Sequence, residues 1–248
     1  MTLDVEQARM TVRLSLYAYR SPEQAKTAVE SLGLTEFNWH SNHSTQAFIA
    51  KGDDTIYVSF RGTEADNPID WIADAKFAPA AGVFGASVHS GFSESLDEVW
   101  SDVASIVEAA STPVVLTGHS LGAALATLAA ARFTEMGTPV ASLHTYGSPR
   151  CGLSQFTSEL DQRTLELSYR FINHIDLVTR VPLLSQGYRH VGNRVYFDAA
   201  GTPHLNASGL RIAFEDIKFR LAHLGSIQAA GLDEHSIDAY VRVVDNLT

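Results

Sequence analysis

Residues 113–137 contain the pattern that most restricts the fold of this chain. The apolar run PVVLTG is followed by the glycine-flanked segment GHSLG and then by the Ala/Leu-rich stretch LGAALATLAAARFTEMG, which ends at Gly137. Short apolar runs of this kind are typical of strands buried on both faces, and such strands occur in parallel sheets covered by helices. The segment therefore predicts a strand, a sharp turn and a helix of an α/β fold.

Other parts of the chain repeat this alternation of strand and helix. Helices are expected at 4–20, 22–31 and 93–110, a hairpin at about 45–51 and 55–60, and later strands in PVASLHTYG, LSYRFIN and YRHVGNRVYF. Strands that alternate with helices indicate βαβ units. We expect a mostly parallel central sheet flanked by helices and, at 248 residues without a linker-like change in composition, a single domain over 1–248.

The charge balance argues against some classes of partner. The chain carries 18 basic and 28 acidic residues, a net charge of -10, and no cluster of Lys or Arg along the sequence. Nucleic acid and strongly anionic membranes are therefore poor candidates. We also expect no transmembrane segment, since no run approaches the roughly 20 apolar residues needed to cross a bilayer.

The first residues and the cysteine content lead to an expectation about location. The start of the chain lacks the basic and apolar regions of a secretory signal. Cys151 is the only cysteine, so no intramolecular disulfide can form. We therefore expect a cytoplasmic protein, with secretion by a route that this sequence does not reveal as the alternative.

The segment Gly118-His119-Ser120-Leu121-Gly122 fits the pattern G-x-S-x-G between an expected strand and an expected helix. In this context the pattern is a nucleophile elbow, in which the serine takes strained dihedral angles and glycines on either side avoid collisions. The following helix would direct its first amides toward a developing oxyanion. The alternative is an ordinary turn in which the serine caps a helix.

A serine hydroxyl needs a base, usually a histidine oriented by a carboxylate. In α/β-hydrolases the order along the chain is serine, acid, histidine. The residues after Ser120 leave two histidines, His190 and His235, and two acids at strand ends, Asp176 and Asp198, of which Asp176 is the better placed. The pattern alone does not decide between the two histidines.

Several motifs together resemble the class 3 lipase family, which comprises fungal-type triacylglycerol lipases and related phospholipases and feruloyl esterases. The motifs, spread over residues 45–242, are VSFRGT, DWIADAKF, VHSGF, LTGHSLGAALA, TYGSPRCG, INHIDLVTRVP, YRHVG and HSIDAY. The resemblance implies that Asp176 is the acid and that His235, followed five residues later by Tyr240, is the base. His190 is then a structural neighbour.

The same resemblance implies an oxyanion hole and a lid. The amide of Leu121 would supply one oxyanion donor, and Thr63 the other through its amide and hydroxyl. A candidate lid lies at about 64–77, where Ile69, Trp71 and Ile72 would cover the site in water and turn outward on lipid; the alternative is that these side chains are fixed core contacts.

An extra segment at about 203–233 has no counterpart that we can place in the fungal members of the family. It contains LRIAFEDIKFRLAHL, whose spacing puts Phe214, Ile217, Leu221 and Leu224 on one helical stripe. We expect a helix that packs on the core, in preference to a second cover over the acyl site.

The expected function is hydrolysis of carboxylic esters by a Ser-Asp-His triad, with triacylglycerol as the leading substrate. The alternatives are a soluble short-chain or feruloyl-type esterase, a phospholipase, and a non-catalytic binding protein on the same fold. The expectation includes no cofactor and no metal. The expected partners are a lipid or ester substrate and, transiently, a lipid–water interface.

Overall fold

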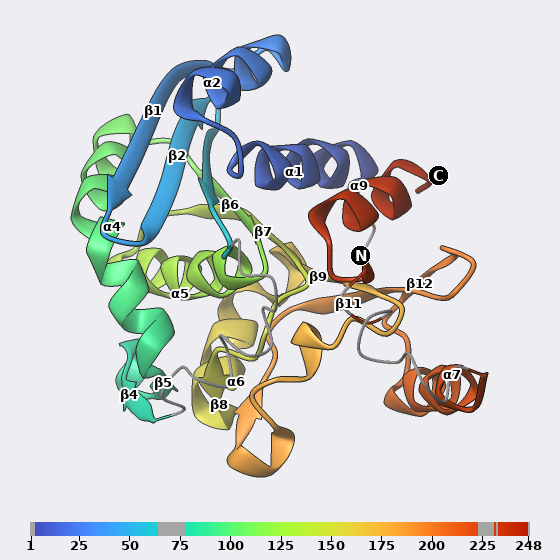
Figure 1. Cartoon of the computed structure of the whole chain (residues 1–248). Helices are drawn as coiled ribbons and strands as arrows, with labels where there is room; N and C mark the ends of the chain where they lie inside the picture. The colour runs from blue at the N-terminus through green and yellow to red at the C-terminus, as the bar shows by residue number, and fades with distance from the viewer. Residues whose placement is uncertain (1–2, 64–77, 223–230, 232, 248) are drawn as a thin grey trace.

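The computed structural model describes residues 3–63, 78–222, 231 and 233–247. Its centre is an eight-stranded sheet (Figure 1). In spatial order the strands are β1 (Thr35–Asn42), β2 (Thr45–Lys51), β3 (Ile56–Phe60), β6 (Val114–His119), β7 (Val140–Tyr146), β9 (Ser168–Asn173), β11 (Asn193–Phe197) and β12 (Pro203–Leu205). The neighbouring strands β3, β6, β7, β9 and β11 run parallel to one another. At the edges, β1 with β2, β2 with β3 and β11 with β12 are antiparallel. The expected mostly parallel sheet is therefore confirmed.

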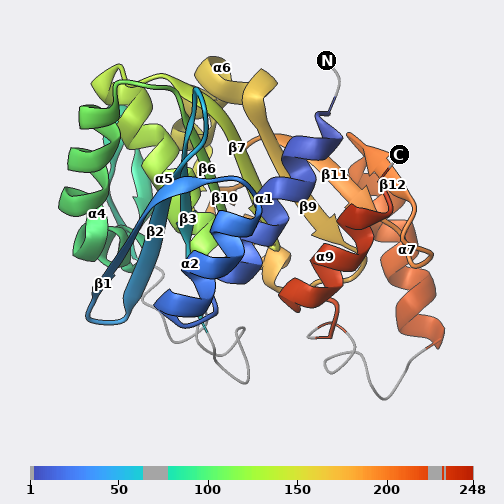
Figure 2. The same ribbon diagram turned by 90° about the horizontal axis from the view of Figure 1, so that it is seen from above.

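Helices cover both faces of this sheet (Figure 2). One face carries α4 (Ser90–Ala110), α5 (Leu121–Met136) and α6 (Ser154–Thr164), and the other carries α1 (Val5–Tyr17) and α9 (Ile237–Asp245). The helix α2 (Pro22–Ser31) follows α1 and begins with a capping box at Ser21. The expected helices at 4–20, 22–31 and 93–110 are therefore confirmed.

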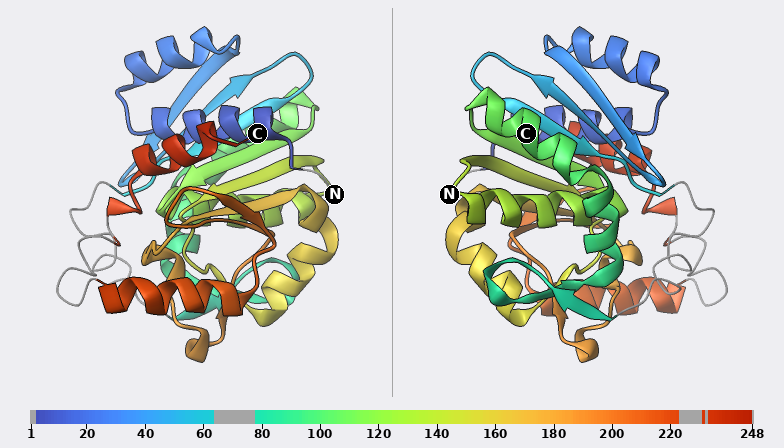
Figure 3. Two further views of the ribbon diagram at one scale, coloured as in Figure 1. Left: turned by 90° about the vertical axis from the view of Figure 1, so that its right-hand side faces the viewer. Right: turned by 90° about the vertical axis from the view of Figure 1, so that its left-hand side faces the viewer.

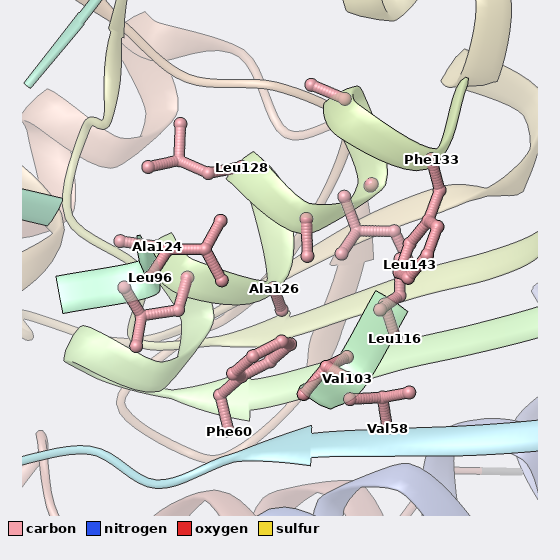
Figure 4. Packing of buried hydrophobic residues seen from close by; sticks show 14 of the residues in the cluster. Val58, Phe60, Leu96, Val103, Leu116, Ala124, Ala126, Leu128, Phe133 and Leu143 are labelled. Carbon is pink, nitrogen blue, oxygen red and sulfur yellow. The ribbon is translucent and has the colours of Figure 1, made fainter. Parts of the chain in front are cut away.

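The larger core lies between the sheet and the helices α4 and α5 (Figure 4). Val58, Phe60 and Leu116 from the strands face Val103 of α4 and Phe133 of α5, and all five are buried. Alanine fills most of the rest of the buried side of α5, so this helix packs close to the sheet. The close packing fixes the start of α5 relative to the end of β6.

Polar side chains are buried between α1 and the opposite face of the sheet. The hydroxyl of Ser15 lies 2.9 Å from the hydroxyl of Thr117, and the hydroxyl of Thr11 lies 2.8 Å from Nδ1 of His144. Burial lowers the pKa of His144 to about 4. His144 therefore has a structural role in the core.

Buried histidines make the free energy of unfolding depend on pH. Burial lowers the pKa of both His89 and His144 to about 4, and lowers that of His119 well below its usual value. An unfolded histidine has a pKa near 6.5, so below that pH the unfolded state binds protons that the folded state does not. The stabilisation by these neutral histidines is complete above pH 6.5 and is lost on acidification, by about 2 kcal/mol each for His89 and His144 at pH 5.

Urea unfolding at pH 7 and pH 5 checks this expectation. The free energy of unfolding should be clearly lower at pH 5, and His144→Gln should remove part of the difference. Equal stabilities at the two pH values would contradict the assignment of neutral, buried histidines.

One strand was missed, and one local prediction was wrong. The strand β1 was not expected, because its residues are polar and mostly exposed at the edge of the sheet. The segment YRHVGNRVYF does not form one strand: Gly192 has a φ of +83° and separates β10 (Tyr188–Arg189) from β11. β10 belongs to a second, four-stranded sheet, which also contains β8 (Gly152–Leu153), β5 (Ser87–His89) and β4 (Pro79–Ala81).

The extra segment forms β12 and the helix α7 (Gly209–Ala222), which lies on the outside of the molecule (Figure 3). The helix is confirmed, but its expected packing is not: Phe214 and Ile217 are 61% and 57% exposed. Ile212, on another side of α7, contacts the small cluster of Ile172, Tyr196 and Ala207 instead. Within the described ranges, no helix has both the length and the apolar character needed to cross a membrane.

Candidate active site

The turn between β6 and α5 holds Ser120 in a strained backbone conformation, with φ 58° and ψ -124°. A side chain at Gly118 would bring its Cβ to 2.3 Å from the carbonyl carbon of Gly122, and one at Gly122 would bring its Cβ to 2.1 Å from the carbonyl oxygen of Phe60. Both glycines are therefore required by the close approach of strand and helix. The amide of Ser120 donates to the carbonyl oxygen of Tyr146 at 3.0 Å, which fixes the turn to β7.

Asp176 and His235 form a buried pair. Nδ1 of His235 lies 2.9 Å from Oδ2 of Asp176, and the two residues are 4% and 0% exposed. Since a carboxylate accepts, Nδ1 carries the proton and Nε2 has the free lone pair. Nε2 is buried and lies within hydrogen-bond distance of no described atom. The imidazole therefore has the tautomer of a base that is ready to accept a proton.

Two further donors hold the carboxylate of Asp176. The hydroxyl of Tyr240 donates to Oδ2 at 2.6 Å, and the amide of Val178 donates to Oδ1 at 2.9 Å. Burial, together with the nearby charge of Asp176, raises the pKa of Tyr240 well above its usual value, so the phenol remains a donor. The family resemblance points to Tyr240 because it follows His235 by five residues, but nothing in the sequence indicates that its hydroxyl contacts Asp176.

His119 connects the loop of His235 to the turn of Ser120. Nε2 of His119 donates to the carbonyl oxygen of His235 at 2.6 Å, and Nδ1 accepts from the hydroxyl of Tyr19 at 2.8 Å. Burial lowers the pKa of His119 well below its usual value, and proximity to His235 adds to the effect. His119 is thus a neutral positioning residue, a role that its place in G-x-S-x-G did not predict.

Gly147 lies where the Ser120 turn, Asp176 and His235 come together. It directly follows Tyr146, whose carbonyl accepts the amide of Ser120, and it has a φ of +61°. A Cβ at this position would lie 2.9 Å from both Oδ2 of Asp176 and Nδ1 of His235. The end of β7 therefore brings the serine turn against the Asp176–His235 pair, although no hydrogen bond joins Ser120 to Nε2 of His235.

The two expected oxyanion donors lie on neighbouring strand ends. β3 and β6 are parallel with Phe60 opposite Gly118, so Thr63 follows β3 at nearly the level at which Ser120 follows β6. The hydroxyl of Thr63 is buried and has no hydrogen-bond partner among the described residues. Leu121 is the first residue of α5, where amides have no acceptor within the helix.

The competing candidates lie elsewhere. Nε2 of His190 is 2.8 Å from the carbonyl oxygen of Thr179, and Asp198 pairs with His204 at 2.8 Å. Neither belongs to the Asp176–His235 pair. The candidate lid at 64–77, with Ile69, Trp71 and Ile72, lies outside the described residues.

Comparison with known proteins identifies the family. The family model for lipase (class 3) matches residues 57–186, which is more than half of the chain. The chain belongs to the class 3 lipase family. The mostly parallel sheet flanked by helices is an α/β-hydrolase fold. A triacylglyceride lipase from Rhizomucor miehei superimposes on it with a TM-score of 0.70 and 26% identity, over 81% of this chain and 83% of that one.

Two other known proteins are similar to this chain. A triacylglycerol lipase whose catalytic centre is a serine protease triad matches with a TM-score of 0.69 and 27% identity, over 83% of this chain and 84% of that chain. The secreted mono- and diacylglycerol lipase 1 of Fusarium solani is 39% identical over 150 residues, 58% of this chain. The matched part of the chain spans only 44% of the length of the Fusarium protein.

Proposed function

We propose that this protein is a lipase, a serine hydrolase that cleaves acylglycerol esters through an acyl-enzyme. The observation that carries the proposal is the buried Asp176–His235 pair. Nε2 of His235 has no hydrogen-bond partner among the described residues, and the carbonyl oxygen of His235 accepts from His119, the residue before Ser120. Membership of the class 3 lipase family and the serine triad of a structural neighbour support the same assignment.

In the proposed mechanism, the hydroxyl oxygen of Ser120 attacks the acyl carbon of the ester while Nε2 of His235 takes the hydroxyl proton. Asp176 stabilises the imidazolium and keeps the ring oriented. The oxyanion accepts hydrogen bonds from Leu121 and Thr63; one such donor typically contributes about 3 kcal/mol to transition-state stabilisation.

Collapse of the tetrahedral intermediate breaks the bond to the glycerol oxygen, which takes the proton from His235 and leaves as the alcohol. Water then attacks the acyl-enzyme, with His235 again as the base, and releases the fatty acid and free Ser120. Every proton passes through one histidine, so the tautomer set by Asp176 serves both half-reactions.

The relatives support acylglycerol as the substrate, since the matched proteins are named as lipases of mono- and diacylglycerol and of triacylglycerol. Activation at a lipid surface, which the lid implied by the family resemblance would provide, is part of the proposal. It predicts that hydrolysis of an emulsified triacylglycerol rises sharply once the substrate exceeds its solubility limit, because a lipid surface would favour the open lid.

Initial rates with tributyrin on both sides of its solubility limit test this prediction, and dissolved p-nitrophenyl butyrate serves as the control. A rate that saturates below the limit and stays level above it would favour the alternative, a soluble esterase without a working lid.

We further propose that residues 1–248 form one domain, since strands of one sheet come from residues 35–205 and the helices at the two ends of the chain pack together on one of its faces. The name of the Fusarium relative includes the word secreted, which favours the secreted alternative over the cytoplasmic location expected from the sequence.

A further inference from the structure

Arginines gather on the face of the sheet that carries α6, beyond the Asp176 loop. Arg170 of β9 and Arg194 of β11 are directly opposite each other in the parallel ladder, and Arg150 from the loop after β7 lines the same cavity of about 280 Å³. Like charges on directly opposed residues destabilise a sheet. The arrangement therefore calls for a compensating group.

Arg170 is buried, Arg150 and Arg194 are half-buried, and all three guanidinium groups have unused donors. Arg170 is 4% exposed, and neither its Nε nor its Nη1 has a hydrogen-bond partner; the Nε atoms of Arg150 and Arg194 are likewise buried without a partner among the described residues. The terminal nitrogens are only partly used: Nη1 of Arg150 donates to the carbonyl oxygens of Arg180 and Pro182, and Nη1 of Arg194 donates to that of Ala207.

Nearby carboxylates do not neutralise this charge. None of the described carboxylates forms an ion pair with Arg150, Arg170 or Arg194, although Asp161 is close enough to affect the pKa of Arg170. Burial and the repulsion of Arg194 and Arg150 lower the pKa of Arg170 to about 9. A buried charge without a partner is costly, so an anion that fills the cavity would remove a large penalty.

The rim of the cavity is apolar. Leu184, 55% exposed, lines it on one side, and α7 lines it on the other through Ile212 and its neighbours. The same helix exposes Leu210 and Phe214, which are 85% and 61% exposed. A cationic floor beneath an apolar rim matches a ligand with an anionic head and acyl chains.

We propose that this arginine cavity binds the phosphate group of a phospholipid, while the apolar rim of α7 contacts the acyl region. Phosphate fits the floor better than a carboxylate does, because several oxygens spread in a tetrahedron can accept from three guanidinium groups at once. The site is separate from Ser120, and binding there does not depend on the proposed hydrolysis.

Isothermal titration with a short-chain diether phosphatidate, which has no ester to hydrolyse, tests the proposal. We expect the phosphatidate to bind, the matched diether glycerol without phosphate not to bind, and Arg194→Gln to weaken binding at least tenfold. The exposed Arg163, which pairs with Glu159 on α6, provides the control variant Arg163→Gln, which should bind as the wild type does. Arg170→Gln is a second variant that tests whether the arginines of the cavity hold the phosphate.

Three results with the phosphatidate or its carboxylate analogue would overturn the proposal, and a fourth would come from inorganic phosphate. These are no binding of the phosphatidate, unchanged binding by Arg194→Gln, or tighter binding of a matched short-chain carboxylate. Inorganic phosphate distinguishes a phospholipid from free phosphate as the ligand. If it binds with the same affinity as the phosphatidate and Leu210→Ser has no effect, the cavity is a site for free phosphate and the phospholipid proposal is refuted. Hydrolysis of p-nitrophenyl butyrate by Arg194→Gln should stay at the wild-type level, so a failure of the triad and a failure of this site give different results.

Discussion

Replacing His235 by alanine is expected to lower kcat for ester hydrolysis by about a millionfold, the scale of loss when the base of a serine triad is removed. The reason is that Nε2 of His235 is the acceptor for the Ser120 proton in both half-reactions, and Asp176 holds it in the required tautomer. Steady-state kinetics with p-nitrophenyl butyrate measure the loss. KM should change far less than kcat, because the imidazole acts on the transition state.

His190→Ala is the matched control, because the pattern of residues alone leaves both histidines as candidates for the base. His190 contacts the carbonyl oxygen of Thr179 and no member of the Asp176–His235 pair, so this variant should keep most of its activity. Loss of activity in His190→Ala with activity retained in His235→Ala would reverse the assignment.

Ser120→Ala is expected to cause a loss of the same size, again about a millionfold in kcat, because Ser120 is the nucleophile that forms the proposed acyl-enzyme. The strained turn and the glycine contacts do not depend on the hydroxyl, so the variant should fold normally. Thermal unfolding beside the kinetic assay separates loss of chemistry from loss of structure.

The two variants should not be additive. Serine and histidine act as one unit, so the double variant Ser120→Ala, His235→Ala should be about as slow as either single variant. Losses that multiply in the double variant would mean that the two residues act independently, which the proposed mechanism does not allow.

Most of the fold could be predicted from local patterns, and the errors have physical causes. Buried strands and the helices between them have distinct apolar patterns, whereas β1 is a polar edge strand whose pairing depends on β2. The break at Gly192 escaped prediction because a single glycine between two strand-like runs does not reveal the positive φ that it adopts. Helical spacing predicted α7 but not which surface its apolar residues would face.

The candidate site was only partly predictable. The elbow at Ser120 is local, so its strand, glycines and helix appear together in the sequence. Asp176 and His235 come from distant segments. Its place at a strand end favoured Asp176 over Asp198, but only the family resemblance separated His235 from His190. The contact of Tyr240 with Asp176 depends on how α9 packs against β9, and no local pattern predicts it.

The arginine cavity shows a different limit of sequence analysis. Arg150, Arg170 and Arg194 are far apart along an acidic chain, so neither composition nor charge clusters revealed them. Only the parallel register of β9 and β11 brings two of them face to face. A site built across strands is invisible until the pairing is known.

The most direct test of the proposed mechanism is covalent labelling with a p-nitrophenyl alkylphosphonate, followed by mass spectrometry of the peptides. The account predicts one phosphonate per chain, attached to Ser120, with simultaneous loss of ester hydrolysis and no labelling of Ser120→Ala. An unlabelled wild-type protein, or a label on another residue that accompanies the loss of activity, would contradict it.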